Sequence, residues 1–174
     1  MIDGITYIEN FYPNATHLFK YLLENVGWDE SMKARKTASF GVAYNYSQIS
    51  YLDQKMPSDI QLICTAIERQ IGFEPNNCLI NFYENGQSKM GYHSDQTDIL
   101  EGNTGVVIVS LGDTRVLRFR RISDKEDKID YALPSGSLIY MNQEVQGLWQ
   151  HAIPKSQSDQ ARMSLTFRKI ITTH

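Results

Sequence analysis

After Gly72 the chain consists of short apolar runs separated by turn signals, and this pattern limits the possible folds more than any other feature. Asn85-Gly86 and Gly112-Asp113 are such signals, because these dipeptides favour tight turns. The runs lie at residues 78–83, 105–111, 116–120, 137–141 and 163–167. Many short strands at close spacing predict a β-sandwich or a barrel.

Two amphipathic helices are predicted ahead of these strands. The first has Asn14 as a candidate N-cap and Gly27 as a candidate left-handed residue after its last turn. The second begins at Ser58, which forms a capping box with Gln61, and ends at Gly72. Apolar residues recur at helical spacing in both: Leu18, Phe19, Leu22, Leu23 and Val26, then Ile60, Ile63, Ala66, Ile67 and Ile71. The predicted class is α+β and mainly β, with helices on one side of a double-sheet core.

Length and charge set further limits. The 174 residues predict a single domain over 1–174. The net charge of -3 counts against binding long duplex DNA through the overall field, although a local basic patch would suffice. Cys64 and Cys78 form no C-x-x-C pair, which favours a reduced intracellular setting. No run approaches the roughly eighteen apolar residues of a membrane span, and the first residues lack a signal-peptide pattern. We therefore expect a cytoplasmic protein with no membrane partner.

A candidate metal site begins at His93-Ser94-Asp95. Residues two apart on a strand point to one side, so His93 and Asp95 can present an imidazole and a carboxylate to one point. Two histidines and one carboxylate suit non-haem Fe(II), because they leave neighbouring coordination positions open. Of the other histidines, His17 lies in the first predicted helix and His174 is the last residue, which leaves His151. On this pattern alone, Asp95 as a turn cap and His151 as a hydrogen-bonded core histidine remain alternatives.

A second signal is the alternation in residues 162–168. Arg162, Ser164, Thr166 and Arg168 fall on one face of a strand, and apolar side chains fall on the other. Two arginines that face a β interior need anions, since an unpaired buried charge is costly. A dicarboxylate such as 2-oxoglutarate supplies one carboxylate for each guanidinium. The alternative is a solvated edge strand, and the upstream histidines and Asp95 favour the dicarboxylate site over it.

These motifs, in this order, resemble the AlkB family of Fe(II)- and 2-oxoglutarate-dependent dioxygenases, which dealkylate nucleic acids. The family pattern runs N-x-Y, H-x-D, a distal H and R-x-N-x-T-F-R. This chain offers Asn81-Phe82-Tyr83, His93-Ser94-Asp95, His151 and residues 162–168, which read RMSLTFR. The resemblance spans about residues 35–170. It implies a jelly-roll core, also called a double-stranded β-helix, with a substrate-recognition lid at about residues 30–56.

The resemblance also assigns roles to residues. It implies that His93, Asp95 and His151 hold Fe(II), with 2-oxoglutarate and dioxygen as cosubstrates. Arg162 is then expected to pair with the distal carboxylate of 2-oxoglutarate, helped by Asn81 and Tyr83. Arg168, with Ser164 close by, is expected near the carboxylate beside the keto group. The implied reaction is demethylation of alkylated bases in DNA or RNA, releasing formaldehyde, succinate and carbon dioxide.

For the substrate, the resemblance implies a flipped methylated base, with single strands favoured. Tyr46 is expected to stack on this base opposite the ring of His93, with Phe40 and Tyr44 as neighbours in the lid. Asp98 is a candidate to attract a cationic base. The alternatives are that the tyrosines are surface or core residues of the lid and that Asp98 is an exposed loop acid.

Two departures from the family pattern leave other readings open. Ser164 stands where the family has asparagine, and Gln96 and Thr97 precede Asp98 where the family usually has an acidic pair. A hydroxylase of the same fold that acts on a protein, a free nucleotide or a small metabolite is one alternative. A non-catalytic β-barrel binding module is another. We expect a monomer in each case.

Overall fold

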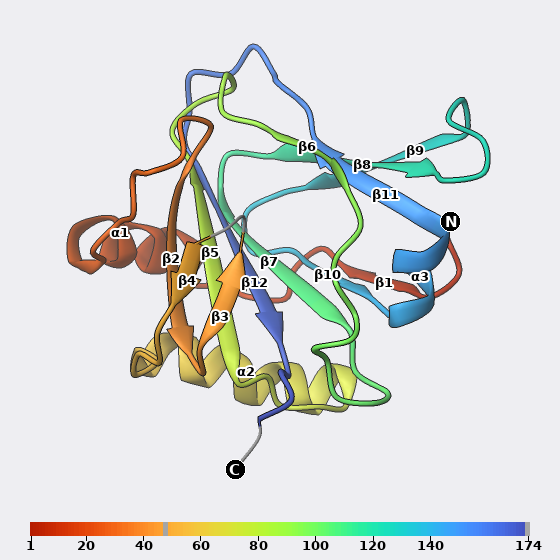
Figure 1. Cartoon of the computed structure of the whole chain (residues 1–174). Coiled ribbons are helices and arrows are strands. Elements are labelled where there is room, and N and C mark those ends of the chain that lie inside the picture. Colours follow the sequence, from red (N-terminus) through yellow and green to blue (C-terminus); the bar gives the residue numbers. More distant parts are fainter. Residues whose placement is uncertain (47–48, 173–174) are drawn as a thin grey trace.

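Two antiparallel sheets form the β core of the computed structural model, which describes residues 1–46 and 49–172 apart from the side chain of Tyr46 (Figure 1). The larger sheet has the order β1 (Ile5–Ile8), β10 (Leu138–Met141), β7 (Val106–Gly112), β12 (Arg162–Arg168), β5 (Asn77–Tyr83) and β2 (Lys36–Gly41). The smaller sheet has the order β6 (Met90–His93), β11 (Trp149–Ile153), β8 (Arg115–Arg121) and β9 (Lys128–Leu133). A separate hairpin joins β3 (Tyr44–Tyr46) to β4 (Ile49–Tyr51).

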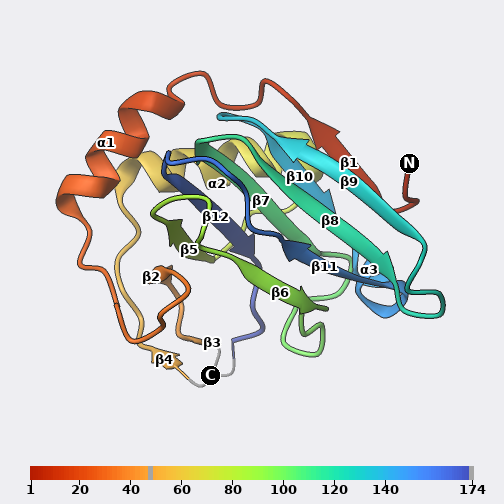
Figure 2. The ribbon, with the colours of Figure 1, turned by 90° about the horizontal axis from the view of Figure 1, so that it is seen from above.

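Two helices cover the outer face of the larger sheet, α1 (Ala15–Asn25) and α2 (Ser58–Ile71), while α3 (Gln143–Leu148) precedes β11 (Figures 1 and 2). Leu18 and Leu22 of α1 and Ile63 and Ile67 of α2 are fully or almost fully buried in the hydrophobic core on this face. Strands β5, β7 and β12 contribute to the same core with alternate residues. The predicted class, mainly β with helices packed on one sheet, is therefore confirmed.

A second hydrophobic core fills the space between the two sheets. It includes Tyr83, Ile108, Leu117, Phe119 and Ile153, and so draws on both sheets. The central strands β5 and β12 are buried along their whole length, because one face meets the helices and the other meets the smaller sheet. The inward face of β12 carries Arg162, Ser164, Thr166 and Arg168. This arrangement confirms the predicted alternation and excludes the solvated-edge reading.

The helix ends differ from the sequence expectation. Asn14 makes no side-chain capping bond, α1 ends at Asn25, and Gly27 is not among the glycines with positive φ. Leu23 is 47% exposed and lies outside the buried stripe. Ser58 is the first residue of α2 rather than its N-cap, and no side-chain capping bond forms there. Gly72 does adopt φ 109°, as expected for the residue that ends α2.

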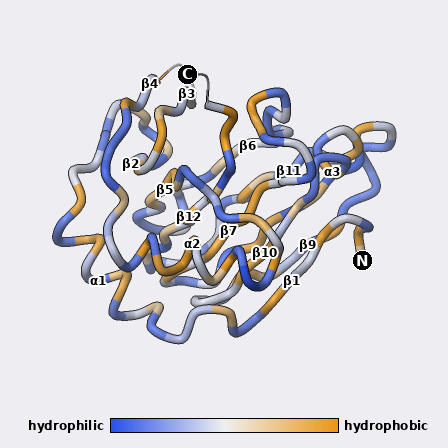
Figure 3. The backbone as a smooth tube through the Cα atoms, turned by 90° about the horizontal axis from the view of Figure 1, so that it is seen from below, coloured by the Kyte–Doolittle hydropathy of each residue, from blue (hydrophilic) through white to orange (hydrophobic). Residues whose placement is uncertain are grey.

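Hydrophobic and hydrophilic segments alternate at short intervals along the chain (Figure 3). No helix in the described ranges has the length and apolar character that crossing a membrane requires. The apolar runs do not predict every element, and β9 and α3 are two of those that lie outside the runs. In β9 charged residues at the surface alternate with half-buried Ile129 and Tyr131, and α3 has only six residues, so neither presents a continuous apolar run.

Gly41→Ala is expected to destabilise the protein at the point where β2 leads into the β3–β4 hairpin. Gly41 has φ +86°, and a Cβ there would lie 2.1 Å from the carbonyl oxygen of Asn76. Strain of this kind costs about 1–3 kcal/mol. Chemical denaturation should show that loss, whereas Gly27→Ala, with open space around its Cβ, should leave the free energy of unfolding nearly unchanged. Equal stability of the two variants would contradict the prediction.

Candidate active site

The two histidines of the predicted metal site are brought together by strand pairing. His93 ends β6, His151 lies in β11, and the two are direct cross-strand partners. Their ring centroids are 4.4 Å apart. The Nδ1 atom of His93 lies 3.1 Å from the carbonyl oxygen of Gly91, which leaves Nε2 to face the site. The register of the smaller sheet thus places two imidazoles at one point between the sheets.

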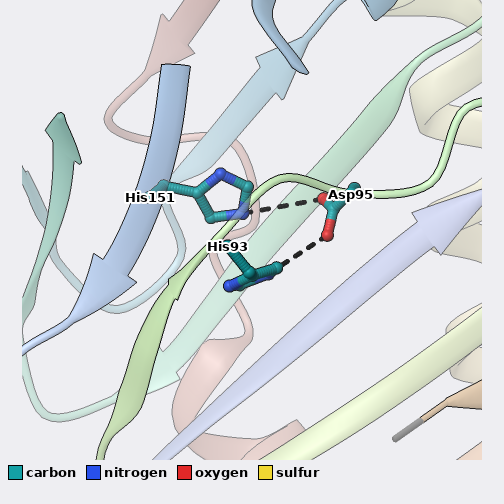
Figure 4. Close-up of side chains that lie close together, drawn as sticks. All are labelled: His93, Asp95 and His151. Atoms are coloured by element: carbon teal, nitrogen blue, oxygen red, sulfur yellow. Dashed lines mark ion pairs between the residues drawn. The ribbon is translucent and has the colours of Figure 1, made fainter. Parts of the chain in front are cut away.

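Asp95 completes the group from the loop that follows β6 (Figure 4). Its Oδ1 lies 3.2 Å from Nε2 of His93, and its Oδ2 lies 3.6 Å from Nε2 of His151. All three ligand atoms lie within 4.8 Å of one another. Ligands in adjacent positions at about 2.1 Å from one ion lie about 3 Å apart, so binding would draw these atoms closer together. The structure therefore brings together the three residues predicted from sequence.

The charges at this site suit a divalent cation. Burial alone would raise the pKa of Asp95, but His151, His93 and Arg168 together hold it well below its ordinary value. Burial lowers the pKa of His151 to about 4, with further lowering by His93 and Arg168. Burial also acts to lower the pKa of His93, but its contacts with Asp95 leave that pKa raised. At neutral pH Asp95 is thus ionised and His151 neutral, as metal ligands must be.

A pocket extends from the metal site into the space between the sheets, with about 400 Å³ of space free of atoms, part of it open to solvent. The pairing of β5 with β12 arranges its polar wall, because Tyr83 is opposite Arg162 and Asn81 is opposite Ser164. Thr166 and Arg168 continue the wall toward Asp95. All five predicted 2-oxoglutarate-binding residues, Asn81, Tyr83, Arg162, Ser164 and Arg168, line this one pocket.

The two arginines test whether a dicarboxylate fits this pocket. Arg162 is fully buried and donates from Nη2 to Oγ of Ser110 at 2.9 Å, while its Nε and Nη1 have no hydrogen-bond partner among the described residues. Burial is the main reason that its pKa is lowered to about 10, and it remains a cation at neutral pH. Nη1 of buried Arg168 is likewise unpartnered. Buried guanidinium groups with unused donors are what a carboxylate at each end of the pocket would satisfy.

An open groove adjoins this pocket and shares Met90, His93 and Asp95 with it. Tyr44 lines the groove, and the guanidinium of Arg168 lies 4.8 Å from the centre of its ring. Arg35 lines the groove as well, and its Nε donates to Oδ1 of Asn81 at 2.9 Å. The groove therefore connects the predicted lid with the polar wall of the inner pocket.

The four predicted substrate residues have different outcomes. Tyr44 lies in the groove, while Tyr46 belongs to β3 with its side chain outside the described part of the structure. Phe40 is 4% exposed and packs in the core on the helix side of β2, so the prediction that it contacts substrate is wrong. Asp98 is an exposed turn residue that lines neither the inner pocket nor the groove. The structure thus does not bring Phe40 or Asp98 to the site.

Two buried residues at the site carry no motif that sequence reasoning detected. Arg115 of β8 donates to the carbonyl oxygens of Asn85, Ser88 and Pro154, and its guanidinium lies 5.5 Å from the centre of the Tyr83 ring. Gln146 of α3 accepts a hydrogen bond from the backbone N–H of Asp95 at 2.7 Å. In the sequence, Arg115 could have been recognised only as a charged residue at an inward position of a predicted strand. No feature of the sequence pointed to Gln146.

Comparison with known proteins places the chain in a family. Residues 4–168 match the model of the 2OG-Fe(II) oxygenase superfamily. The alpha-ketoglutarate-dependent dioxygenase alkB homolog 3 of Bos taurus is 29% identical over 176 residues, which cover 90% of this chain and 62% of that protein. The DNA oxidative demethylase ALKBH2 of Homo sapiens is 30% identical over 151 residues, covering 80% of this chain and 58% of that protein. The chain thus spans about three fifths of the length of these curated relatives.

A solved structure supports the fold. The structure of OsALKBH1 superposes with a TM-score of 0.74 at 16% sequence identity, covering 97% of this chain and 99% of that one. The predicted jelly-roll core is therefore confirmed. With the family model matched over residues 4–168 and the His93–Asp95–His151 group in place, the chain belongs to the AlkB family within the 2OG-Fe(II) oxygenase superfamily.

Proposed function

We propose that this protein is an Fe(II)- and 2-oxoglutarate-dependent dioxygenase that removes methyl groups from alkylated bases in nucleic acid. The observation that carries the proposal is the convergence of two imidazoles and one carboxylate beside a pocket with two buried guanidiniums, each of which has at least one nitrogen without a hydrogen-bond partner among the described residues. His93, Asp95 and His151 would hold the iron, while Arg162 and Arg168 would hold the two carboxylates of 2-oxoglutarate. With dioxygen, the bound iron and 2-oxoglutarate supply the oxidising power to hydroxylate a methyl carbon, with succinate and carbon dioxide as products.

The chain's own residues set the geometry for that reaction. Arg162 would fix the distal carboxylate at the closed end of the pocket, where Tyr83 is 1% exposed and limits its length. Arg168 lies 3.6 Å from Oδ1 of Asp95, so the carboxylate beside the keto group would sit next to the metal ligands. Apolar side chains of Leu79, Ile108 and Leu117 line the rest of the pocket and would keep water out.

The relatives motivate the choice of substrate, and the groove supports it. One relative is named a DNA oxidative demethylase. The groove opens at His93 and Asp95, so a flipped base inserted there would reach the metal. A net charge of -3 favours single strands over long duplex DNA. The three metal ligands and the polar wall come from one chain, which supports action as a monomer.

The proposal is tested with a panel of oligonucleotides that each carry one N-methylated base. The panel includes DNA and RNA in single-stranded and duplex form, incubated with Fe(II), 2-oxoglutarate and air. We expect formaldehyde and the demethylated oligonucleotide by mass spectrometry, with the highest rate on single strands. Reactions without 2-oxoglutarate and with unmethylated oligonucleotides are the controls. Consumption of 2-oxoglutarate with no loss of methyl group from any oligonucleotide would overturn the substrate assignment.

That negative result would favour the second candidate, a hydroxylase of the same fold for a protein, free nucleotide or small metabolite. Two observations support this alternative: the acidic net charge, and the position of Asp98 away from the groove. A binding measurement distinguishes the two candidate functions. Salt-sensitive binding to single-stranded oligonucleotides is expected for the demethylase and not for a hydroxylase of small molecules.

Tyr44→Ala is expected to weaken the use of oligonucleotide substrates more than it weakens binding of 2-oxoglutarate. Tyr44 lines the groove, and stacking of a base on an aromatic ring contributes about 1–3 kcal/mol. The KM for a methylated oligonucleotide should therefore rise roughly tenfold, and Tyr44→Phe, which keeps the ring, should stay near wild type. Tyr21→Ala, at an exposed position on α1, is the matched control. An unchanged KM in Tyr44→Ala would remove Tyr44 from the substrate site, and the proposed platform role would then rest on Tyr46 alone.

A further inference from the structure

The three metal ligands are not held in the same way. His93 and His151 belong to paired strands, and each is the other's cross-strand partner. Asp95 lies two residues beyond the end of β6, outside any strand. The backbone of this loop therefore needs anchors of its own if the carboxylate is to keep its place.

Two hydrogen bonds anchor the loop, and both lead to the segment of α3 and β11. Oγ of Ser94 donates to the carbonyl oxygen of Trp149 at 2.8 Å. The backbone N–H of Asp95 donates to Oε1 of Gln146 at 2.7 Å. The second bond acts on the metal ligand itself, because it fixes the backbone from which the Asp95 side chain extends.

The side of Gln146 remote from Asp95 is also fixed. Gln146 is 5% exposed, and its Nε2 lies 3.7 Å from Sδ of Met141. Only its oxygen can accept from an N–H, so the orientation of the side-chain amide is determined by Asp95. The helix that carries Gln146 is capped by Asn142, whose Oδ1 accepts from the N–H of Val145 at 3.2 Å. Gln146 thus joins a fixed helix to the loop of Asp95.

The hydrogen bond between Asp95 and Gln146 opposes a competing interaction of the Asp95 carboxylate. Nη2 of Arg168 lies 3.6 Å from Oδ1 of Asp95, so this cation competes with a metal ion for the same carboxylate oxygen. The bond from Asp95 to Gln146 holds the backbone of this loop, so without it the carboxylate would be free to shift between Arg168 and the two imidazoles.

We propose that Gln146 is a positioning residue that holds Asp95 in the geometry for metal binding. The inference rests on the proposed function, in that it takes the group of His93, Asp95 and His151 as a metal site. It concerns metal affinity alone and requires nothing of the organic substrate. Partners of this kind, outside the set of direct ligands, typically change metal affinity by roughly 10- to 100-fold when they are removed.

The test is a titration of the intact apoprotein with Mn(II), followed by the electron paramagnetic resonance signal of the free ion. Gln146→Leu removes the acceptor, and we expect a roughly 10- to 100-fold weaker affinity. Gln146→Glu keeps an acceptor oxygen at the same reach, and we expect an affinity close to wild type. Thermal unfolding of each metal-free variant gives its stability separately.

Gln143→Leu is the matched control, because Gln143 is on the same helix and its Nε2 also bridges to a loop, at the carbonyl oxygens of Glu101 and Thr104. It should lower the unfolding temperature without changing Mn(II) affinity. Equal affinity of Gln146→Leu and wild type, or equal loss in Gln143→Leu, would overturn the proposal. Wild-type protein that binds no Mn(II) would overturn it together with the metal site. Wild-type protein that binds Mn(II) but demethylates no oligonucleotide would overturn only the proposed substrate.

Discussion

His151→Ala is expected to abolish both metal binding and turnover of 2-oxoglutarate. His151 is 3% exposed, and its partner in the site, Asp95, has its Oδ2 3.6 Å from the imidazole. Losing one of three protein ligands leaves an incomplete coordination shell. Since even outer partners cost up to about 100-fold in metal affinity, the loss here should exceed that value. Mn(II) titration and succinate formation measure the two effects.

His17→Ala is the control for this variant. His17 is an exposed histidine on α1, the helix that packs on the outer face of the larger sheet. The His17→Ala protein should bind Mn(II) and form succinate as the wild-type protein does. Removal of His151 also leaves space beside Phe119, whose ring centroid lies 5.6 Å from that of His151. The unfolding temperature of the metal-free variants therefore needs to be compared. A folded His151→Ala protein with wild-type Mn(II) affinity would show that His151 is not a ligand.

The polar wall was predictable because it depends on local alternation, whereas Asp95 lies beyond the end of β6 and not on the strand that the alternation of His93 and Asp95 assumed. The register of β12 follows from Met163, Leu165 and Phe167, which must face one core, so Arg162 and Arg168 must face the other side. His151 was found by elimination among the histidines rather than from a pattern. What joined it to His93 is the pairing of β6 with β11, and pairing between strands this far apart in sequence leaves no local signal.

The wrong prediction for Phe40 has a physical reason. Residues 37–40 of β2 are all buried, because one face of the strand meets the helix-side core and the other face carries Thr37, which hydrogen-bonds to Tyr51 of β4. The alternation of side chains along a strand shows that Phe40 and Thr37 lie on opposite faces of β2, but it does not show which of the two faces is directed toward the helices. Arg115 was missed for a related reason, because its three carbonyl partners come from two loops that only the fold brings together.

Arg162→Ala is expected to raise the concentration of 2-oxoglutarate required for turnover by roughly 30-fold or more. Truncating one partner of a buried, hydrogen-bonded charge pair costs about 2–5 kcal/mol, and each 1.4 kcal/mol is about a factor of ten. Mn(II) affinity measured without 2-oxoglutarate should stay near wild type, because the described contacts of Arg162 are with Ser110 and Tyr83 rather than with the three metal ligands. Arg118→Ala, at an exposed arginine paired with Asp130, is the control and should change neither quantity.

Arg162→Ala should lower activity without lowering the thermal stability of the metal-free protein. In the free protein Arg162 is buried with two unpartnered nitrogens, Nε and Nη1, and this desolvation lowers its pKa to about 10. Replacing an unpaired buried charge with an apolar group removes that cost, so metal-free Arg162→Ala should unfold at a temperature no lower than wild type. Adding 2-oxoglutarate with Mn(II) should then stabilise the wild-type protein much more than the variant. A 2-oxo acid that lacks the distal carboxylate should bind the wild-type protein and Arg162→Ala equally weakly. Tighter binding of this compound to the wild-type protein than to the variant would show that Arg162 does not bind the distal carboxylate.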